Sequence, residues 1–377
     1  MAHDIKAVAL AGGGGLGAYQ AGVMKALVQR DMLKDIQCFS GTSVGALNAV
    51  LWSIGDAELS EYVWKKWVDP VGMLGKLERS QSGFHPSRET LRAILRNTGV
   101  TRIRHTAPVY ACAYDIKAGR AEYFYLNDKP ESEMTDILLA SSAISVIYEP
   151  VSIGGRLYKD GSSSFTSPLD NYPVGILYEK GYRDILLVPL RSDFDGSDVR
   201  SWHSPARADM YSNFPDAKIS VLKPSCGIGG AGGIVDFSPD SINMRIAVGF
   251  YDGYNFGGRQ DEPVPPEGHH DKVIRSLAEK YLRTSADMES FIALRKNKYV
   301  TAVNPTLGGR MWYKDIFELD GFRIQWHCKV PVVGRIMENH YRILGRDDEL
   351  RAYYFDPAHF IEDLTIFGEQ KNKGMIK

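Results

Sequence analysis

The chain has 377 residues, of which 44% are hydrophobic and 24% are charged, so it can bury a sizeable globular core. Its net charge of −1 argues against non-specific binding of nucleic acid, which needs a basic surface. Cys38, Cys112, Cys226 and Cys328 lie far apart and form no CxxC or Cys/His cluster, which argues against a zinc site and favours buried free thiols.

Hydropathy gives no sign of a membrane-spanning segment. No uninterrupted apolar run reaches the roughly 18 residues that a spanning helix needs. The first residues, "MAHDIKAVALAGG", lead from a short apolar stretch into glycines, which is typical of a strand and not of a signal peptide. We therefore expect a cytoplasmic protein and leave peripheral contact with membranes open.

Short apolar runs alternate with helical patterns through the first two thirds of the chain. This alternation predicts an α/β fold of three layers, with a mostly parallel sheet, helices on both faces and ligands at the carboxyl ends of the strands. The predicted strands are 5–12, 35–41, 108–116, 120–127, 155–161, 184–190 and 217–225, and the clearest helices are 18–33 and 44–55.

A change in composition marks a boundary late in the chain. We expect a first domain over residues 5–258, a Pro- and Gly-rich linker over 259–270 and a C-terminal α+β extension over 271–377. The extension contains a helical pattern followed by two aromatic-rich strand pairs and no catalytic signature, so its role is not predicted. The helical pattern covers 271–297, and the strand pairs turn at Asp320-Gly321 and Gly345-Arg346.

The segment "GGGGLG" (12–17) follows a predicted strand, precedes a helix and fits the pattern G-x-G-x-x-G. A dinucleotide site would also need an acidic residue at the end of the second strand, but Asp35 lies before that strand. The alternative is an oxyanion hole, because backbone N–H groups of a glycine turn at a helix start converge on negative charge. The oxyanion-hole hypothesis is favoured, because a G-x-S-x-G motif follows in the sequence.

The stretch "FSGTSVGALNAV" (39–50) contains G-x-S-x-G, with Ser43 between Gly41 and Gly45. Such glycines let a strand and a helix pack closely around a strained turn that exposes a nucleophilic serine. The alternative is that Ser43 simply caps the helix at 44–55. The glycine loop follows the first strand and the elbow follows the second, whereas α/β-hydrolases place several strands before the elbow, so the order indicates another fold family.

No residue near Ser43 in the sequence can accept its proton, so the base must come from a distant segment. Six of the nine histidines follow the elbow by more than a hundred residues, and His203 is the candidate among them within the first domain. Asp160, in "GGRLYKDGSSS", ends a predicted strand and is expected at the rim of the parallel sheet. A carboxylate with a pKa near 4 is a weak base, but desolvation and a stabilised oxyanion let it accept a proton. An Asp-Gly turn without chemistry remains the alternative.

Taken together, these segments resemble the patatin-like phospholipase family. "VALAGGGGLGAYQAGVMKAL" is similar to its glycine loop, "GTSVGALNA" to its elbow and "YKDGSSS" to its Asp-Gly segment, and "PVYACAYDIKAGRAEYF" and "LLASSAISVIYEPV" follow in the same order. The resemblance covers residues 5 to about 260. It implies a Ser43–Asp160 dyad without histidine, acting on acyl esters of lipids with no cofactor and no metal.

The resemblance also assigns the supporting residues of this site. Gly41 and Gly45 would form the elbow, and Gly161 and Ser162 would complete the Asp-Gly motif. The oxyanion hole would be built from Gly12, Gly13, Gly14, Gly15 and Gly17.

Three positions depart from the family pattern. Leu16 stands where the family usually has Arg or Lys, Ser162 replaces the usual Gly or Ala, and Ser145-Val146 lacks the usual proline. These departures bear on substrate fit more than on activity.

The stretch 51–77 is rich in tryptophan and lysine, a composition that suits a membrane interface. A helix whose aromatic side chains pack on the core is the alternative. We expect a phospholipase A or lysophospholipase type of lipid acyl hydrolase, with a silent lipid- or nucleotide-binding protein on the same fold as the alternative. The head group, the acyl position, the balance with acyl transfer, any regulator and the oligomeric state are not predicted.

Overall fold

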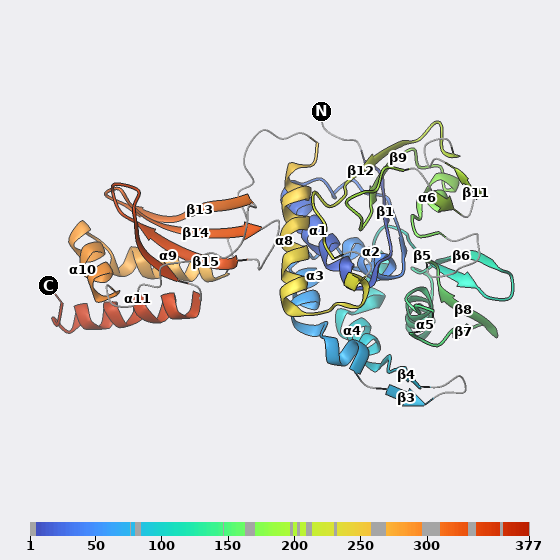
Figure 1. Cartoon of the computed structure of the whole chain (residues 1–377), viewed down its shortest axis with the longest axis horizontal. Helices are drawn as coiled ribbons and strands as arrows, with labels where there is room; N and C mark the ends of the chain where they lie inside the picture. Colours follow the sequence, from blue (N-terminus) through green and yellow to red (C-terminus); the bar gives the residue numbers. More distant parts are fainter. Residues whose placement is uncertain are drawn as a thin grey trace. The chain divides into compact units, whose positions relative to one another are not determined.

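The computed structural model describes residues 5–75, 77–79, 84–145, 147–162, 170–196, 199–201, 204–208, 213–229, 232–257, 269–295, 310–330, 337–354 and 357–376. The chain divides into two compact units, Met1–Gln260 and Asp261–Lys377 (Figure 1). Most of the expected linker falls outside the described residues.

The first unit is built on an eight-stranded mixed sheet in the order β12-β9-β1-β2-β5-β8-β7, with β6 also paired to β5. The pairs on the β12 side of β5 are parallel, and the pairs that β5 makes with β6 and β8 are antiparallel, as is β7 with β8. The expectation of a mostly parallel sheet with helices around it is confirmed, with an antiparallel end that the sequence did not predict. The strands are β1 (Ala7–Leu10), β2 (Cys38–Thr42), β5 (Val109–Asp115), β6 (Arg120–Tyr125), β7 (Val151–Ile153), β8 (Arg156–Asp160), β9 (Asp184–Val188) and β12 (Lys218–Val221).

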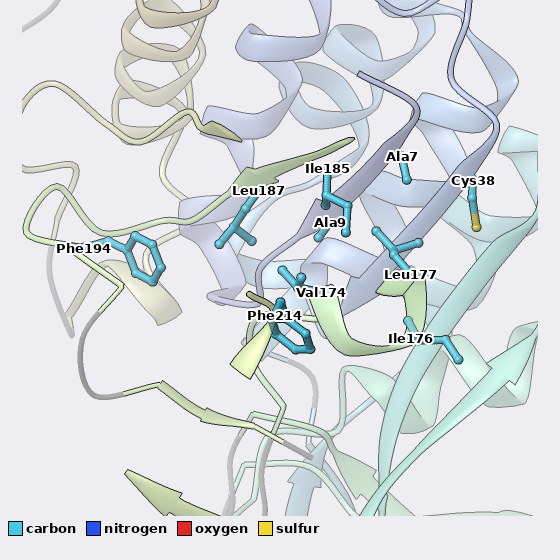
Figure 2. Close-up of a cluster of buried hydrophobic side chains, with 10 residues drawn as sticks. All are labelled: Ala7, Ala9, Cys38, Val174, Ile176, Leu177, Ile185, Leu187, Phe194 and Phe214. Atoms are coloured by element: carbon cyan, nitrogen blue, oxygen red, sulfur yellow. The ribbon is translucent and has the colours of Figure 1, made fainter. Parts of the chain in front are cut away.

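Both faces of the central strands are buried. Alternate residues of β1 point to opposite faces, and all four of its residues have no exposed surface. Ala7 and Ala9 pack in one cluster with Leu177 of α6 (Val174–Glu179) and Leu187 of β9 (Figure 2). On the sheet, α2 (Val44–Ile54) contacts β1, β2 and β5, so a continuous apolar strand is covered on both sides as a parallel core strand requires.

Further helices surround this core. Figure 1 shows α8, in yellow, lying along α1, in blue, and these two helices make extensive contact. The remaining helical elements of the first unit are η1 (Gly14–Gly17), α1 (Ala18–Gln29), α3 (Ala57–Tyr62), η2 (Val63–Trp67), η3 (Val71–Gly75), α4 (Glu89–Thr98), η4 (Val100–His105), α5 (Glu131–Ser141), η5 (Gly232–Val235) and α8 (Pro239–Asn255). Two small hairpins pair β3 (Leu77–Arg79) with β4 (Phe84–Pro86) and β10 (Val199–Ser201) with β11 (Ser204–Ala208).

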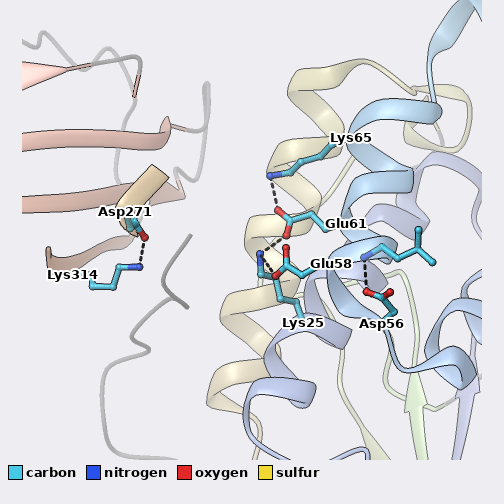
Figure 3. A network of polar contacts seen from close by, with 8 residues as sticks. Lys25, Asp56, Glu58, Glu61, Lys65, Asp271 and Lys314 are labelled. Atoms are coloured by element: carbon cyan, nitrogen blue, oxygen red, sulfur yellow. Dashed lines mark hydrogen bonds and ion pairs between the residues drawn. The ribbon is translucent and has the colours of Figure 1, made fainter. Parts of the chain in front are cut away.

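An ion-pair network ties α1 to the α3–η2 segment. The Glu61 carboxylate accepts hydrogen bonds from Lys25 and pairs with Lys65 at 2.7 Å (Figure 3). Burial would raise the pKa of Glu61, but the two ammonium groups outweigh it and lower the pKa to about 2. A lowered pKa means that this stabilisation is present above the usual value of 4.5 and is lost as the pH falls toward 2.

In its described residues, the second unit combines a four-stranded antiparallel sheet with three helices. Both predicted strand pairs are present, whereas the pattern at 271–297 forms two helices that break at Leu282–Thr284 and begins earlier, at His269. The elements are α9 (His269–Tyr281), α10 (Ser285–Arg295), β13 (Arg310–Leu319), β14 (Phe322–Val330), β15 (Met337–Leu344), β16 (Leu350–Tyr354) and α11 (Pro357–Asn372). Among the described residues of both units, no helix has the length and apolar character needed to cross a bilayer.

The crossing of α1 and α8 depends on two glycines. A Cβ atom at Gly249 would lie 2.0 Å from the Tyr19 carbonyl oxygen, and one at Gly22 would lie 1.9 Å from the Ile246 carbonyl oxygen. We predict that Gly249→Ala lowers the free energy of unfolding by about 1–3 kcal/mol, because one of two buried helix backbones must move. Gly232→Ala is the matched control, since its Cβ would meet no atom within 4 Å. Equal urea midpoints for the two variants would contradict the prediction.

Candidate active site

The chain leaves β2 through a strained turn at Ser43. The Ser43 backbone has φ 55° and ψ −127°, in a region that L-residues rarely adopt. Close approach of backbones explains the flanking glycines: a Cβ at Gly41 would lie 2.2 Å from the Gly45 carbonyl oxygen, and one at Gly45 would lie 2.1 Å from the Leu10 carbonyl oxygen. This geometry is that of a nucleophile elbow.

The Ser43 hydroxyl points to a carboxylate. Although Ser43 occupies the N-cap position of α2, its side chain makes no capping hydrogen bond. Its Oγ donates instead to Oδ2 of Asp160 at 2.5 Å. The second Asp160 oxygen accepts the Ser162 backbone N–H at 2.8 Å and the Ser162 hydroxyl at 2.6 Å. Asp160 is fully buried and Ser43 is 2% exposed. The structure therefore brings together the serine and the aspartate that the sequence singled out.

The sheet register explains how residues 117 positions apart meet. Along β5, Cys112 is the partner of Thr42 in β2, and the next residue, Ala113, is the partner of Asp160 in β8. Because β6 pairs with the same β5 residues, β2 and β8 must share the opposite edge. β2 is parallel to β5 and β8 is antiparallel, so their carboxyl ends meet head to head. The expectation that Asp160 stands at the rim of a parallel sheet is wrong in this respect.

Burial dominates the electrostatics of Asp160. Desolvation raises the pKa of this carboxyl above its ordinary value of 3.8, while hydrogen bonds from Ser162 and Ser43 and the charge of Arg88 oppose the shift. A raised pKa makes Asp160 a stronger base than a solvated aspartate. The same burial makes the ionised form costly for folding.

The glycine loop presents backbone donors next to the elbow. The Gly12 N–H is occupied by the Asn171 side-chain oxygen at 2.9 Å. Within the described part of the chain, the N–H groups of Gly13, Gly14 and Gly15 have no acceptor. Gly14 lines the same cavity as Ser43.

Gly17 has a packing role at the elbow. A Cβ atom there would lie 2.4 Å from a Val44 methyl group. Its lack of a side chain therefore lets η1 approach the start of α2.

A buried arginine from α8 stands behind this loop. Arg245 has no exposed surface, and it donates to the carbonyl oxygens of Ile228 at 3.0 Å and Asp236 at 2.6 Å. A Cβ at Gly233 would touch both the Leu16 side chain, at 2.5 Å, and Nη2 of Arg245, at 2.9 Å. Leu16 stands where the family resemblance implies a cation, and Arg245, which pairs with the Asp236 carboxylate at 3.4 Å, lies beside it.

Sequence reasoning missed three polar partners of the site. Ser141 accepts the Ser43 N–H at 2.9 Å and donates to the Cys112 carbonyl oxygen at 2.6 Å, which fixes the elbow. Asn171 holds Gly12. Arg88 donates to Ser142 Oγ at 2.7 Å and lines the cavity. Ser141 lies within the quoted "LLASSAI" segment, but nothing in the sequence distinguished it from its neighbours.

The cavity beside Ser43 is apolar. It lies between α2 and α4, with walls that include Leu47, Leu91 and Trp64. Its polar wall residue Asn48 is fully paired: its amide donates to the Gly17 carbonyl and to Gln20, and its oxygen accepts Trp64 Nε1 at 3.0 Å. No histidine is among the described residues lining this cavity.

The tryptophan positions in 51–77 support the alternative in which aromatic side chains pack on the core. Trp52 and Trp64 are buried, whereas Tyr62, 51% exposed, Val71, 73% exposed, and Leu77, 59% exposed, face solvent. The histidine candidate, His203, lies outside the described residues.

Part of the sequence matches the model of one known protein family. Residues 8–178 match the model described as patatin-like phospholipase. These residues carry a patatin-like domain. No curated protein matches the sequence.

Among solved structures, VipD from Legionella pneumophila is 15% identical, with 45% of this chain and 47% of that chain covered and a TM-score of 0.32. The type III effector protein ExoU is 14% identical, with 80% of this chain and 66% of that chain covered and a TM-score of 0.34. This chain thus spans less than two thirds of either structure.

The buried carboxylate predicts a conflict between activity and stability. Because its pKa is raised in the folded state, the stability it contributes is present below pH 3.8 and is lost as the pH rises through the raised pKa. Asp160→Asn should therefore unfold with a higher free energy than the unsubstituted protein at neutral pH, and this gain should vanish in acid. Asp193→Asn, at an exposed aspartate paired with Arg191, is the control and should give no gain. A destabilised Asp160→Asn at neutral pH would refute this account.

Proposed function

We propose that this protein is a serine lipid acyl hydrolase of the phospholipase A or lysophospholipase type, in which Ser43 is the nucleophile and Asp160 is the base. The family match supports a lipid hydrolase in general terms. The observation that carries the finer proposal is the 2.5 Å hydrogen bond from the Ser43 hydroxyl to a fully buried carboxylate, at a strained elbow.

The chemistry proceeds in two steps. Ser43 Oγ attacks the ester carbonyl carbon while its proton passes to Asp160, and the carbonyl oxygen becomes an oxyanion held by the N–H groups of Gly13, Gly14 and Gly15. The bond to the leaving alcohol then breaks, and the alcohol takes the proton from Asp160. Water next attacks the acyl-serine, gives its proton to Asp160 and releases the fatty acid as Ser43 recovers its hydrogen.

The substrate class follows from the cavity. Its walls are mostly apolar, and the polar groups of Asn48 are satisfied within the protein. The unpaired donor on this wall is Nη1 of Arg88, which is buried without a hydrogen-bond partner among the described residues. Arg88 is the one charged side chain among the described lining residues. An acyl chain with its ester at Ser43 fits this arrangement.

A second candidate is a silent lipid-binding protein on the same fold, which the missing cation at Leu16 favours. The two are separated by covalent labelling of Ser43 with a fluorophosphonate, since only an activated serine reacts. Arg245 lies beside Leu16, but it pairs with the Asp236 carboxylate at 3.4 Å, so the labelling experiment and not this residue decides between the two candidates.

Removal of either member of the dyad should abolish turnover. We predict that Ser43→Ala and Asp160→Asn each lower kcat for phospholipid hydrolysis by about 1,000-fold or more, with unchanged circular dichroism. Ser53→Ala, a serine on the same helix bonded to Thr106, is the control and should retain full activity. Turnover by a pure Asp160→Asn preparation would exclude Asp160 as the base.

The fall of kcat/KM at acid pH should follow protonation of the Asp160 carboxylate. Activity requires the carboxylate form, so kcat/KM should fall as the pH drops through a pKa raised above 3.8. The Ser162 hydroxyl holds this pKa down by its hydrogen bond, so Ser162→Ala should move the limb upward by about one pH unit. A histidine base elsewhere would leave the limb of Ser162→Ala where it is in the unsubstituted enzyme.

A further inference from the structure

The cavity beside Ser43 follows two helices that start at the dyad. Its wall on α2 is formed by Val44, Leu47 and Leu51, and its wall on α4 by Leu91, Leu95 and Thr98. These residues recur three or four positions apart, so each set forms one continuous stripe along its helix. The cavity is therefore elongated along the helix axes.

Both helices begin at the catalytic end. Ser43 immediately precedes α2, and Arg88, which immediately precedes α4, bonds to Ser142 next to the elbow partner Ser141. Both helices also finish together, because η4 follows α4 directly and contacts α2, and Thr106 at the end of η4 bonds to Ser53 near the end of α2. The helices thus run in the same direction away from Ser43.

The end of the cavity at Thr98 is followed directly in the chain by the buried segment η4. Val100 and Ile103 of η4 have no exposed surface, and Leu51, Val63 and Ile94 pack into one buried cluster. The Thr98 hydroxyl is satisfied by the carbonyl oxygens of its own helix, at Ile94 and Leu95, so it offers no hydrogen bond to a ligand. The charged group, Arg88, stands at the opposite end, beside the dyad.

From these observations we propose that the cavity is a blind channel for a single acyl chain and that its depth, set at Thr98 and Leu95, selects chains of medium length. This inference rests on the proposed function. The eight residues from Ser43 to Leu51 advance about 12 Å and the ten from Arg88 to Thr98 about 15 Å. A zigzag carbon chain with bonds of about 1.5 Å advances about 1.3 Å per carbon, so about 9 to 12 carbons fit beyond the carbonyl.

Orientation follows from the two ends of the channel. The ester lies at Ser43 and the methyl end points to Thr98, because the closed end has no unpaired polar group. Each methylene that enters the channel should raise the affinity for the ester roughly fourfold. Carbons for which the channel has no room add no affinity and must bend or stay outside.

The test compares esters of 8, 12 and 16 carbons by kcat/KM. The unsubstituted enzyme should prefer 12 carbons to 16 by about tenfold or more, because a 16-carbon chain whose ester reaches Ser43 must bend and withdraw two or more methylenes from the channel. Thr98→Phe fills the closed end and should raise the ratio of the 8-carbon to the 12-carbon ester by about tenfold. Asn97→Phe is the matched control, since Asn97 is the exposed neighbour on the same helix, and its ratio should stay within about twofold of the unsubstituted enzyme.

Two further measurements keep the outcome decisive. If Thr98→Phe does not fold, Leu95→Ala serves, because it deepens the channel and should shift preference toward 16 carbons. The channel proposal is overturned if Thr98→Phe gives the same chain-length ratio as Asn97→Phe. Where Leu95→Ala replaces Thr98→Phe, the same comparison with Asn97→Phe applies.

Displacement of a fluorescent fatty acid from Ser43→Ala by octanoate, dodecanoate and hexadecanoate tests the channel without catalysis. A length limit in binding without any hydrolysis by the unsubstituted protein would support the channel and refute the proposed function. Hydrolysis without a length limit would refute the channel alone.

Discussion

The hydrogen bond between Ser43 and Asp160 depends on the shared edge of one strand. β5 is longer than β2, so its last residues remain free to pair with a strand that runs the other way. That arrangement brings the carboxyl ends of two opposed strands to adjacent positions, Cys112 and Ala113. The geometry of this Ser–Asp pair is therefore set by the strand pairing of the sheet.

The same arrangement fixes the chemical environment of the dyad. Asp160 lies within the sheet and not at an exposed rim, so water is excluded and the pKa of its carboxyl is raised. Ser162 partly offsets that cost through two hydrogen bonds to the oxygen that Ser43 does not use. Burial thus makes the Asp160 carboxylate more basic and at the same time lowers the stability of the fold, a trade-off that is common at functional sites.

Helix α2 connects Ser43 to the apolar cavity. Its first residue follows Ser43, and its side chains at Val44, Leu47 and Leu51 line the cavity together with Trp64 and residues of α4. On the other side of the elbow, the glycine loop is covered by the segment that ends at Asp236, and Arg245 holds this cover in place. Three segments distant in the sequence, at 12–17, 43–54 and 228–245, thereby form one site.

The sequence by itself determined the strand and helix pattern of the sheet's parallel half and the two glycine motifs, because these follow from local periodicity and from residues with special backbone demands. The pairing of Ser43 with Asp160 was expected from the resemblance to the patatin-like family, since the local pattern at Asp160 fits an Asp-Gly turn equally well. Tertiary structure decided what no local pattern encodes: the antiparallel pairing that carries Asp160 to Ser43, the roles of Ser141, Asn171 and Arg245, and the cavity between α2 and α4. The tryptophans of 51–77 show the reason. Their composition is the same for a membrane surface and for a core, and burial depends on which distant residues pack against them.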